Sequence, residues 1–165
     1  MNRQRLPDAA ISADVIVGFP GETEQDFQDT LDLMQEVVFD SVNTAAYSPR
    51  PNTPAAIFPD QIDDTVKQER LQRINALNLE HAKVRRARML GRTVEVLIEE
   101  RNIQQPSQVM GRTRHGYIVY CEGDIDQLRG RTVQISISQA ETYFLVGDIV
   151  VSSSSEEPVV AAETL

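Results

Sequence analysis

The first part of the chain alternates a strand, a turn and a helix. A short apolar run at residues 15–17 stands between an acidic residue and a glycine, which is typical of a strand buried on both faces of a parallel sheet. A turn containing glycine and proline follows at residues 18–21, and Thr23 with Asp26 predicts a capping box at the start of a helix. Residues 40–47 predict a second strand, and the connection is long enough for a parallel neighbour of the first. The apolar stripe of the helix is expected at Phe27, Leu31, Met34 and Val38.

Two strands and one helix leave apolar faces without a partner. Residues 1–61 therefore look like a section of a larger sheet or barrel. The turn at residues 18–21 lies at the carboxyl end of its strand, where α/β proteins place ligands. The proline-rich loop at residues 48–59 carries Ser, Arg, Asn and Thr side chains, and it is interpreted either as a ligand loop or as a plain exit loop.

Residues 62–90 predict a long linking helix that begins at Asp63 or Asp64 and reaches about Met89. Acidic residues at its start and arginines at its end match the helix dipole. His81 is interpreted as an ordinary helix residue, because no second His, Cys or acidic cluster stands at metal-binding spacing. The apolar stripe is expected to contain Val66, Ile74, Leu77 and Val84, with Leu71 and His81 beside it.

After Gly91 the apolar positions alternate with polar ones. This pattern predicts four or five short strands, and hence a small antiparallel barrel or sandwich, over residues 91–151. Cys121 is expected to be a core or edge residue of the third strand, and residues 152–165 are expected to form a disordered tail. The predicted fold class is α+β: a partial α/β section, a long helix and a small antiparallel, OB-like β-barrel. The alternating apolar positions are Val94, Val96 and Ile98, then Ile118 and Tyr120, then Val133, Ile135 and Ile137, with a last strand at residues 143–151.

The charge is distributed unevenly along the chain, whose formal net charge is -9. Residues 1–82 hold 6 basic and 14 acidic side chains, and residues 132–165 hold 5 acidic and no basic ones. Residues 83–131 hold 10 basic and 6 acidic side chains, a balance of +4. A basic segment in an acidic protein suggests a local contact with a polyanion, although a solvated charged face would explain the charge equally well.

Two predicted turns of the barrel gather basic side chains. Tyr117 and Tyr120 near the first of these turns would suit stacking on nucleobases, and packing in a core or interface is the alternative. The pattern favours nucleic-acid binding by the barrel. The basic residues are Arg112, Arg114 and His115 at one turn, and Arg129 and Arg131 at the other.

Cysteine is scarce, since Cys121 is the only one in the sequence. An intrachain disulfide or a cysteine-based metal or cluster site is therefore excluded. The first residues lack the apolar core of a signal peptide, and no apolar run is long enough to span a bilayer, so a soluble, cytoplasmic protein is expected.

Several segments together resemble the radical-SAM tRNA methylthiotransferases. The first and third of those below are specific in combination, and the third favours the MiaB-type branch over the branch that modifies a ribosomal protein. Asn52 stands where the family typically has glycine, a departure that a loop can absorb. The matching segments are residues 12–23 (SADVIVGFPGET), 39–41 (FDS), 47–56 (YSPRPNTPAA), 69–73 (ERLQR) and 110–114 (MGRTR).

The resemblance implies a place for each part of the chain. Residues 1–61 would be the C-terminal section of a radical-SAM barrel, and residues 91–151 would be a TRAM domain that binds tRNA. Ile16 would press on the adenine of S-adenosylmethionine, Gly18 would admit a close approach of the backbone, and Glu22 would help to fix the turn. The residues implied near this cofactor are Ile16, Gly18, Gly21, Glu22, Ser48 and Arg50. Those implied at tRNA are Arg88, Arg112, Arg114, His115 and Arg131.

The complete enzyme implied by the resemblance converts N6-isopentenyladenosine at position 37, in the anticodon region of tRNA, to its 2-methylthio derivative. It uses S-adenosylmethionine and two 4Fe–4S clusters held by two sets of three cysteines, one of them a Cys-x3-Cys-x2-Cys loop. Cys121 matches none of those positions, and cluster ligation requires thiolates. We therefore expect a C-terminal part that is inactive alone and has the missing N-terminal portion as a possible partner. A non-catalytic RNA-binding module and an acidic protein with no RNA role are the alternatives.

Overall fold

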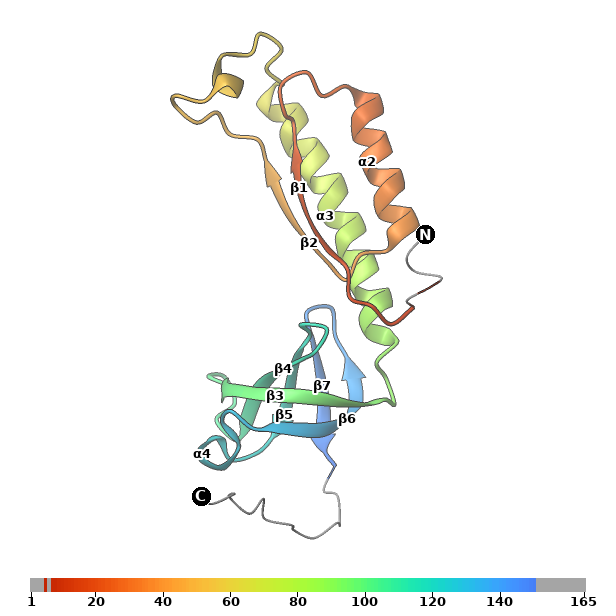
Figure 1. Cartoon of the computed structure of the whole chain (residues 1–165), viewed down its shortest axis with the longest axis vertical. Helices are drawn as coiled ribbons and strands as arrows, with labels where there is room; N and C mark the ends of the chain where they lie inside the picture. Colours follow the sequence, from red (N-terminus) through yellow and green to blue (C-terminus); the bar gives the residue numbers. More distant parts are fainter. Residues whose placement is uncertain (1–4, 6, 151–165) are drawn as a thin grey trace, which may run out of the picture.

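The computed structural model describes residue 5 and residues 7–150. A parallel strand–helix–strand unit and a β-barrel are joined by one long helix (Figure 1). This is the α+β class that the sequence predicts. The first unit and the linking helix comprise β1 (Ser12–Val17), α2 (Glu24–Val37), β2 (Ser41–Ala46), the 3-10 turn η1 (Pro54–Ile57) and α3 (Asp64–Ala87). The barrel comprises β3 (Thr93–Arg101), β4 (Gln108–Thr113), β5 (Ile118–Glu122), α4 (Ile125–Leu128), β6 (Thr132–Ala140) and β7 (Phe144–Ile149).

Strands β1 and β2 form a parallel pair in register from Ser12 opposite Ser41 to Val17 opposite Ala46, as predicted. Helices α2 and α3 cover one face of this pair, where Phe27 and Ile74 are fully buried. The expectation that the first strand is buried on both faces is wrong, because Ile16 on the other face is 58% exposed. Within the described residues β1 and β2 pair only with each other, so this face and both sheet edges are open.

Helix α2 begins at the predicted capping box. The Asp26 amide donates to Thr23 Oγ1 at 3.1 Å, and the Thr23 amide donates to Asp26 Oδ2 at 2.9 Å. Phe27, Leu31 and Met34 form its buried stripe. Val38, expected in that stripe, instead caps the helix in the left-handed conformation with φ 51°, because the chain must turn there toward β2.

The buried face of α3 differs from the predicted stripe. Val84 is 52% exposed, while Lys67, Arg70 and Arg85 are buried beside Ile74 and His81. Long cationic side chains bury their methylene stems when their charged ends reach a partner, and apolar periodicity alone does not detect such positions. Burial lowers the pKa of His81.

The five barrel strands close in the order β3-β4-β5-β7-β6. Four of these pairings are antiparallel, and β5 runs parallel to β7. The predicted barrel is confirmed, but its description as antiparallel holds only in part. A closed ring with an odd number of strands cannot alternate direction throughout, so one parallel pair is unavoidable.

The barrel core consists of small and medium apolar side chains with two glycines. A Cβ atom at Gly111 or Gly147 would lie 2.3 Å from a carbonyl oxygen of the neighbouring strand, so only glycine allows the strands to come this close. In β5 the residues that face inward are Val119 and Cys121, while Ile118 and Tyr120 lie on the alternate, less buried positions. Cys121 lies in the core as predicted, and burial raises the pKa of its thiol to about 11. Other core residues are Val96, Ile98, Val109, Ile135, Ile137 and Leu145.

A buried polar cluster joins the barrel to the first unit. The Asp40 carboxylate accepts hydrogen bonds from Arg85 Nε at 2.7 Å, from the Ile11 amide at 2.9 Å and from the Tyr117 hydroxyl. The Arg86 guanidinium lies 5.4 Å from the centre of the Tyr117 ring. We call Asp40, Arg85 and Tyr117 the joint. Each of its three residues is about as buried as a core residue.

A second set of contacts lies beside the joint. His115 Nε2 donates to the Asp8 carbonyl oxygen at 2.8 Å, and Arg92 pairs with the Asp8 carboxylate at 3.3 Å. The tail predicted at residues 152–165 lies outside the described residues. Among the helices described, none has the length and apolar character needed to cross a membrane.

Replacing Tyr117 with Phe should lower the free energy of unfolding by about 1–3 kcal/mol, because the variant loses a hydrogen bond to a buried carboxylate but keeps the ring beneath Arg86. Burial and the bond to Asp40 raise the pKa of Tyr117 to about 12, above its ordinary value of 10.0. The stabilisation is therefore complete below pH 10 and is lost as the pH rises through 12. Urea unfolding at several pH values, followed by circular dichroism, measures this difference.

The matched control is Tyr120→Phe. The Tyr120 hydroxyl is on the outer surface of the barrel, so this substitution should change the free energy of unfolding by less than about 0.5 kcal/mol. A difference between the wild type and Tyr117→Phe that grows above pH 10 would contradict the role assigned to this hydroxyl.

Candidate functional site

The predicted basic residues of the β4–β5 turn are close together but already paired. Arg112 Nε donates to Glu99 at 3.2 Å, and Arg114 Nε donates to Glu95 at 2.6 Å. The bond to Glu95 raises the pKa of Arg114 above its ordinary value, although the Arg114 side chain is 79% exposed. His115 is tied to Asp8 of the first unit. This turn presents cations whose charge is partly neutralised by glutamates of β3.

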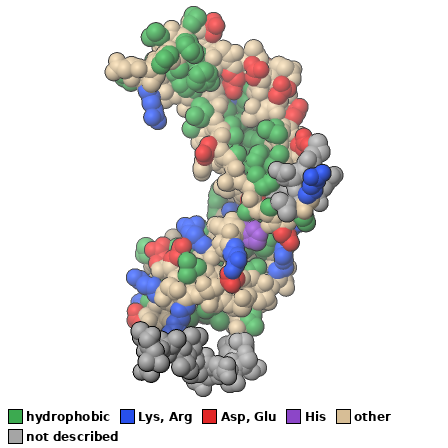
Figure 2. Space-filling model, in the orientation of Figure 1, with side chains coloured by type: hydrophobic (Ala, Val, Ile, Leu, Met, Phe, Trp, Pro, Cys, Tyr) green, Lys and Arg blue, Asp and Glu red, His purple; other side chains and the backbone are tan. Residues whose placement is uncertain are grey.

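The other predicted RNA contacts lie apart from this turn. Arg131 is exposed at the start of β6, and Arg112 lies across β3 from it, since Leu97 pairs with Arg112 on one side and with Thr132 on the other. Arg88 is exposed at the end of α3. Within the described residues neither Arg88 nor Arg131 makes an ion pair. On the face of the barrel that Figure 2 shows, cationic and acidic side chains lie among each other and do not form a single basic patch.

Only one of the two tyrosines proposed for base stacking is available. Tyr117 is buried in the joint, so the packing alternative is correct for it. Tyr120 points outward from β5 and meets the ring of Phe144 on β7 edge-on, with 5.2 Å between the ring centres. Phe144 was missed as a site residue because its neighbour is set by the non-local pairing of β5 with β7.

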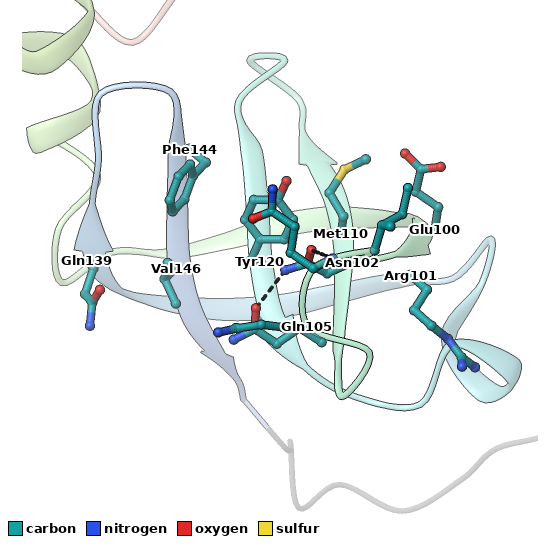
Figure 3. Close-up of a pocket in the computed structure, with 12 residues that line it drawn as sticks. Glu100, Arg101, Asn102, Gln105, Met110, Tyr120, Gln139, Phe144 and Val146 are labelled. Carbon is teal, nitrogen blue, oxygen red and sulfur yellow. Dashed lines mark hydrogen bonds between the residues drawn. The ribbon is translucent and has the colours of Figure 1, made fainter.

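Tyr120 and Phe144 line a hollow of about 910 Å³ on the outer surface of the barrel (Figure 3). Its wall is formed by residues of all five barrel strands and by the loop between β3 and β4. Asn102 in that loop donates from Nδ2 to Gln108 Oε1 at 3.1 Å. Aromatic rings, side-chain amides and Met110 therefore share one open site.

The glycine turn after β1 is fixed by α3. Gly18 has φ 72°, and its amide donates to Glu22 Oε2 at 2.7 Å. The same oxygen accepts from Arg70 Nη1 at 2.6 Å, and the buried Arg70 also donates to the Glu22 carbonyl oxygen at 3.1 Å. A Cβ atom at Gly18 would lie 2.3 Å from Cγ of Lys67. Among the described residues, the Lys67 side chain is therefore the group that occupies the space next to Gly18.

The six residues implied at S-adenosylmethionine lie at the carboxyl ends of β1 and β2, because parallel strands end at the same edge. Gly18, Gly21 and Glu22 belong to the turn. Ser48 and Arg50 are exposed in the loop after β2, and Ile16 lies on the open face. On that face Asn43 also donates to Asp14 Oδ1 at 2.8 Å.

Aromatic rings gather at the same end of the sheet. Phe19 meets Tyr47 with 5.2 Å between ring centres and Phe58 with 6.3 Å, both edge-on. Phe19 and Phe58 are exposed. The matching segments contain Phe19 and Tyr47, but they do not indicate that these two rings and Phe58 come together.

The residues present do not fit an iron–sulfur cluster. The one cysteine of the sequence is enclosed in the barrel core, and residue 5 and residues 7–150 contain no group of three His, Cys, Asp or Glu side chains placed to hold a metal ion. Thiolate ligands for a cluster are missing from this sequence.

Residues 87–150 match the family model of the TRAM domain. The match includes all five barrel strands and the end of α3, and β1, α2 and β2 lie outside it. The barrel is therefore a TRAM domain, which is generally an RNA-binding module.

Gly18→Ala should destabilise the protein by about 1–3 kcal/mol more than Gly21→Ala. Both glycines have a left-handed φ, so both substitutions carry the same backbone strain of about 1–2 kcal/mol. Only at Gly18 would the new Cβ collide with a neighbour, because nothing lies within 4 Å at Gly21. Urea unfolding of the two variants gives the comparison.

Lys67→Ala removes the colliding Cγ, so the extra cost of Gly18→Ala should largely disappear in a Lys67→Ala background. An unchanged cost in that background would show that the Lys67 stem does not determine the glycine at this position.

Proposed function

We propose that this chain is the C-terminal part of a MiaB-type radical-SAM tRNA methylthiotransferase, whose TRAM domain binds tRNA. The observation that carries the proposal is the combination of a TRAM domain with a parallel strand–helix–strand unit whose outer face and edges are open. An enzyme of this kind would convert N6-isopentenyladenosine-37 of tRNA to its 2-methylthio derivative, and it would act in the cytoplasm.

The open face of the first unit supports the radical-SAM part of the proposal. In a barrel of parallel strands with helices outside, the face away from the helices is the interior. The face of β1 and β2 opposite α2 and α3 carries Ile16, Asp14 and Asn43, and it would become such an interior beside further strands. The glycine turn and the loop carrying Ser48 and Arg50 would then border the site.

S-adenosylmethionine would supply the radical-generating and methyl-donating chemistry in the complete enzyme. Ile16 offers an exposed apolar surface for a purine ring, and Arg50 offers a cation to a carboxylate. Glu22 is already used by Gly18 and Arg70, so it would position the turn. The cluster ligands would have to come from residues outside this sequence, and no step through a cluster is assigned to this chain.

A non-catalytic RNA-binding module is the second candidate. It is favoured by the chemistry of the donor set, since the one thiol is enclosed in the barrel core and its pKa is raised to about 11. In this case the first unit would serve only to support the barrel through the joint.

The chain should bind tRNA with an affinity that falls as salt rises, because phosphate contacts release counterions. Arg114→Ala should weaken binding and reduce the slope of log K against log salt by about 0.7–0.9. Lys83→Ala removes the same charge from α3, outside the barrel, and should leave the slope unchanged. Filter binding at several salt concentrations measures both variants.

Glu95→Gln should change the affinity for tRNA in the opposite direction to Arg114→Ala. This substitution removes the charge that pairs with Arg114, so it should strengthen tRNA binding if Arg114 contacts a phosphate. Equal binding by wild type, Arg114→Ala and Glu95→Gln would remove this turn from the RNA interface. Absence of tRNA binding at low salt would contradict the proposed function.

Co-expression tests the hypothesis that the chain is part of an active methylthiotransferase. In cells lacking their own methylthiotransferase, this chain and a separate polypeptide with the cysteine-bearing part of a MiaB-type enzyme should together produce 2-methylthio nucleosides, detected by mass spectrometry of digested tRNA. Either polypeptide alone should produce none. Arg50→Ala should lower the yield without changing tRNA affinity, since the loop after β2 that contains this residue lies at the end of the first unit far from the barrel (Figure 1). No product from the pair would favour the non-catalytic module.

A further inference from the structure

The hollow on the TRAM barrel combines an aromatic surface with an orderly arrangement of outward side chains. Strand pairing places Met110, Tyr120 and Val146 side by side. The next outward row, two residues along each strand, contains Arg112, Ile118 and Phe144. Tyr120 and Phe144 meet at an interplanar angle of 80°, so their rings present one face and one edge to a group in the hollow.

The polar side chains of the hollow are mainly amides. Gln105, Gln108 and Gln139 line it together with Asn102, and Figure 3 shows Gln139 and Arg101 at opposite ends. An amide offers both a donor and an acceptor, which is what the edge of a nucleobase requires. Among the lining residues only Glu100 and Arg101 are charged, and their charges cancel. The hollow therefore suits a neutral, flat, hydrogen-bonding group better than a phosphate.

A cation stands next to this neutral site. Arg112 occupies the row adjacent to Tyr120, roughly 7 Å along the strand. From there it can reach the backbone of a nucleotide whose base occupies the hollow. Its ion pair with Glu99 is on the surface, where such pairs contribute little and exchange readily.

We propose that the hollow binds an unpaired nucleobase of single-stranded RNA, which stacks on one ring of the Tyr120–Phe144 pair, meets the other ring edge-on and faces the amides with its edge. Arg112 contacts the backbone of the same strand. Bases within a duplex are stacked on each other and do not offer their faces, so the site selects single-stranded loops or ends. This inference rests on the proposed function only in requiring that the TRAM domain binds RNA.

The sequence contains no tryptophan, so Tyr120→Trp introduces a single fluorescent reporter into the hollow. Titration with a single-stranded oligoribonucleotide of about 12 nucleotides should quench its emission, because a base stacks on the indole. A duplex of the same sequence and an abasic strand of the same length should quench little. Leu33→Trp on the exposed side of α2 is the control, and its emission should not respond to any of the three.

Affinity measurements separate stacking from phosphate contact. Tyr120→Leu and Phe144→Leu keep an apolar side chain and should each weaken single-strand binding roughly tenfold, with unchanged affinity for the abasic strand. Arg112→Ala should weaken binding of the intact single strand and of the abasic strand alike. Circular dichroism melting curves of the leucine variants establish that the barrel remains folded.

Two results overturn the inference. Wild-type affinity of both leucine variants for the single strand would exclude the hollow as the base site, while RNA binding by the domain would stand. Preference of the wild type for the duplex over the single strand would also exclude the hollow as a base site. Failure of the wild type to bind any of the RNAs would instead remove the proposed function, and this inference with it.

Discussion

The buried carboxylate of Asp40 is the interaction on which the arrangement of the two units depends. A buried charge is costly unless every lone pair finds a partner, and Asp40 has Arg85 from α3, the Ile11 amide and the Tyr117 hydroxyl from the barrel. Removing one charged member of a buried ion pair, as Arg85 is here, typically costs about 3–5 kcal/mol, because the remaining charge stays buried. Since the three donors come from different segments, the barrel cannot turn on α3 without exposing or orphaning this charge. The joint thus fixes the direction in which the TRAM domain faces.

This fixed direction constrains how one RNA can reach both candidate sites. The carboxyl ends of β1 and β2, with the glycine turn and the loop of Arg50, lie at the end of the first unit far from the barrel (Figure 1). Helix α3 has 24 residues and is therefore about 36 Å long. An RNA held by the barrel must extend along most of this length, on the open side of β1 and β2, to bring a base to the glycine turn. The basic β4–β5 turn stands at the start of that path, because His115 contacts Asp8 beside the joint.

Local features were predictable from the sequence, and features formed by distant residues were not. The capping box of Thr23 and Asp26, the parallel pair and the barrel follow from short-range pattern and turn chemistry. The buried cationic face of α3 was not predicted, because Lys67, Arg70 and Arg85 are charged residues and such residues are normally exposed. Arg70 and Arg85 can be buried here because they pair with Glu22 and Asp40. Tyr117 and Tyr120 are the same residue type, yet the fold places the Tyr117 side chain in the joint and points the Tyr120 side chain outward. For the same reason the resemblance assigned a role to Glu22 but none to Arg70, which holds it, although Arg70 lies in a matching segment. It likewise indicated the basic turn but not the hollow beside it.

The charge balance of the barrel bears on how it can bind RNA at all. The chain is acidic overall, and two of the predicted phosphate-binding arginines are paired with Glu95 and Glu99. Phosphate contacts position an RNA but do not specify it, and here they must compete with those glutamates. Binding that relied on charge alone would therefore be weak and strongly dependent on salt. Stacking on Tyr120 and Phe144 carries no such competition, because no acidic partner has to be displaced. A barrel whose Arg112 and Arg114 are already paired with glutamates is thus better suited to recognise exposed bases than to bind a duplex by its backbone.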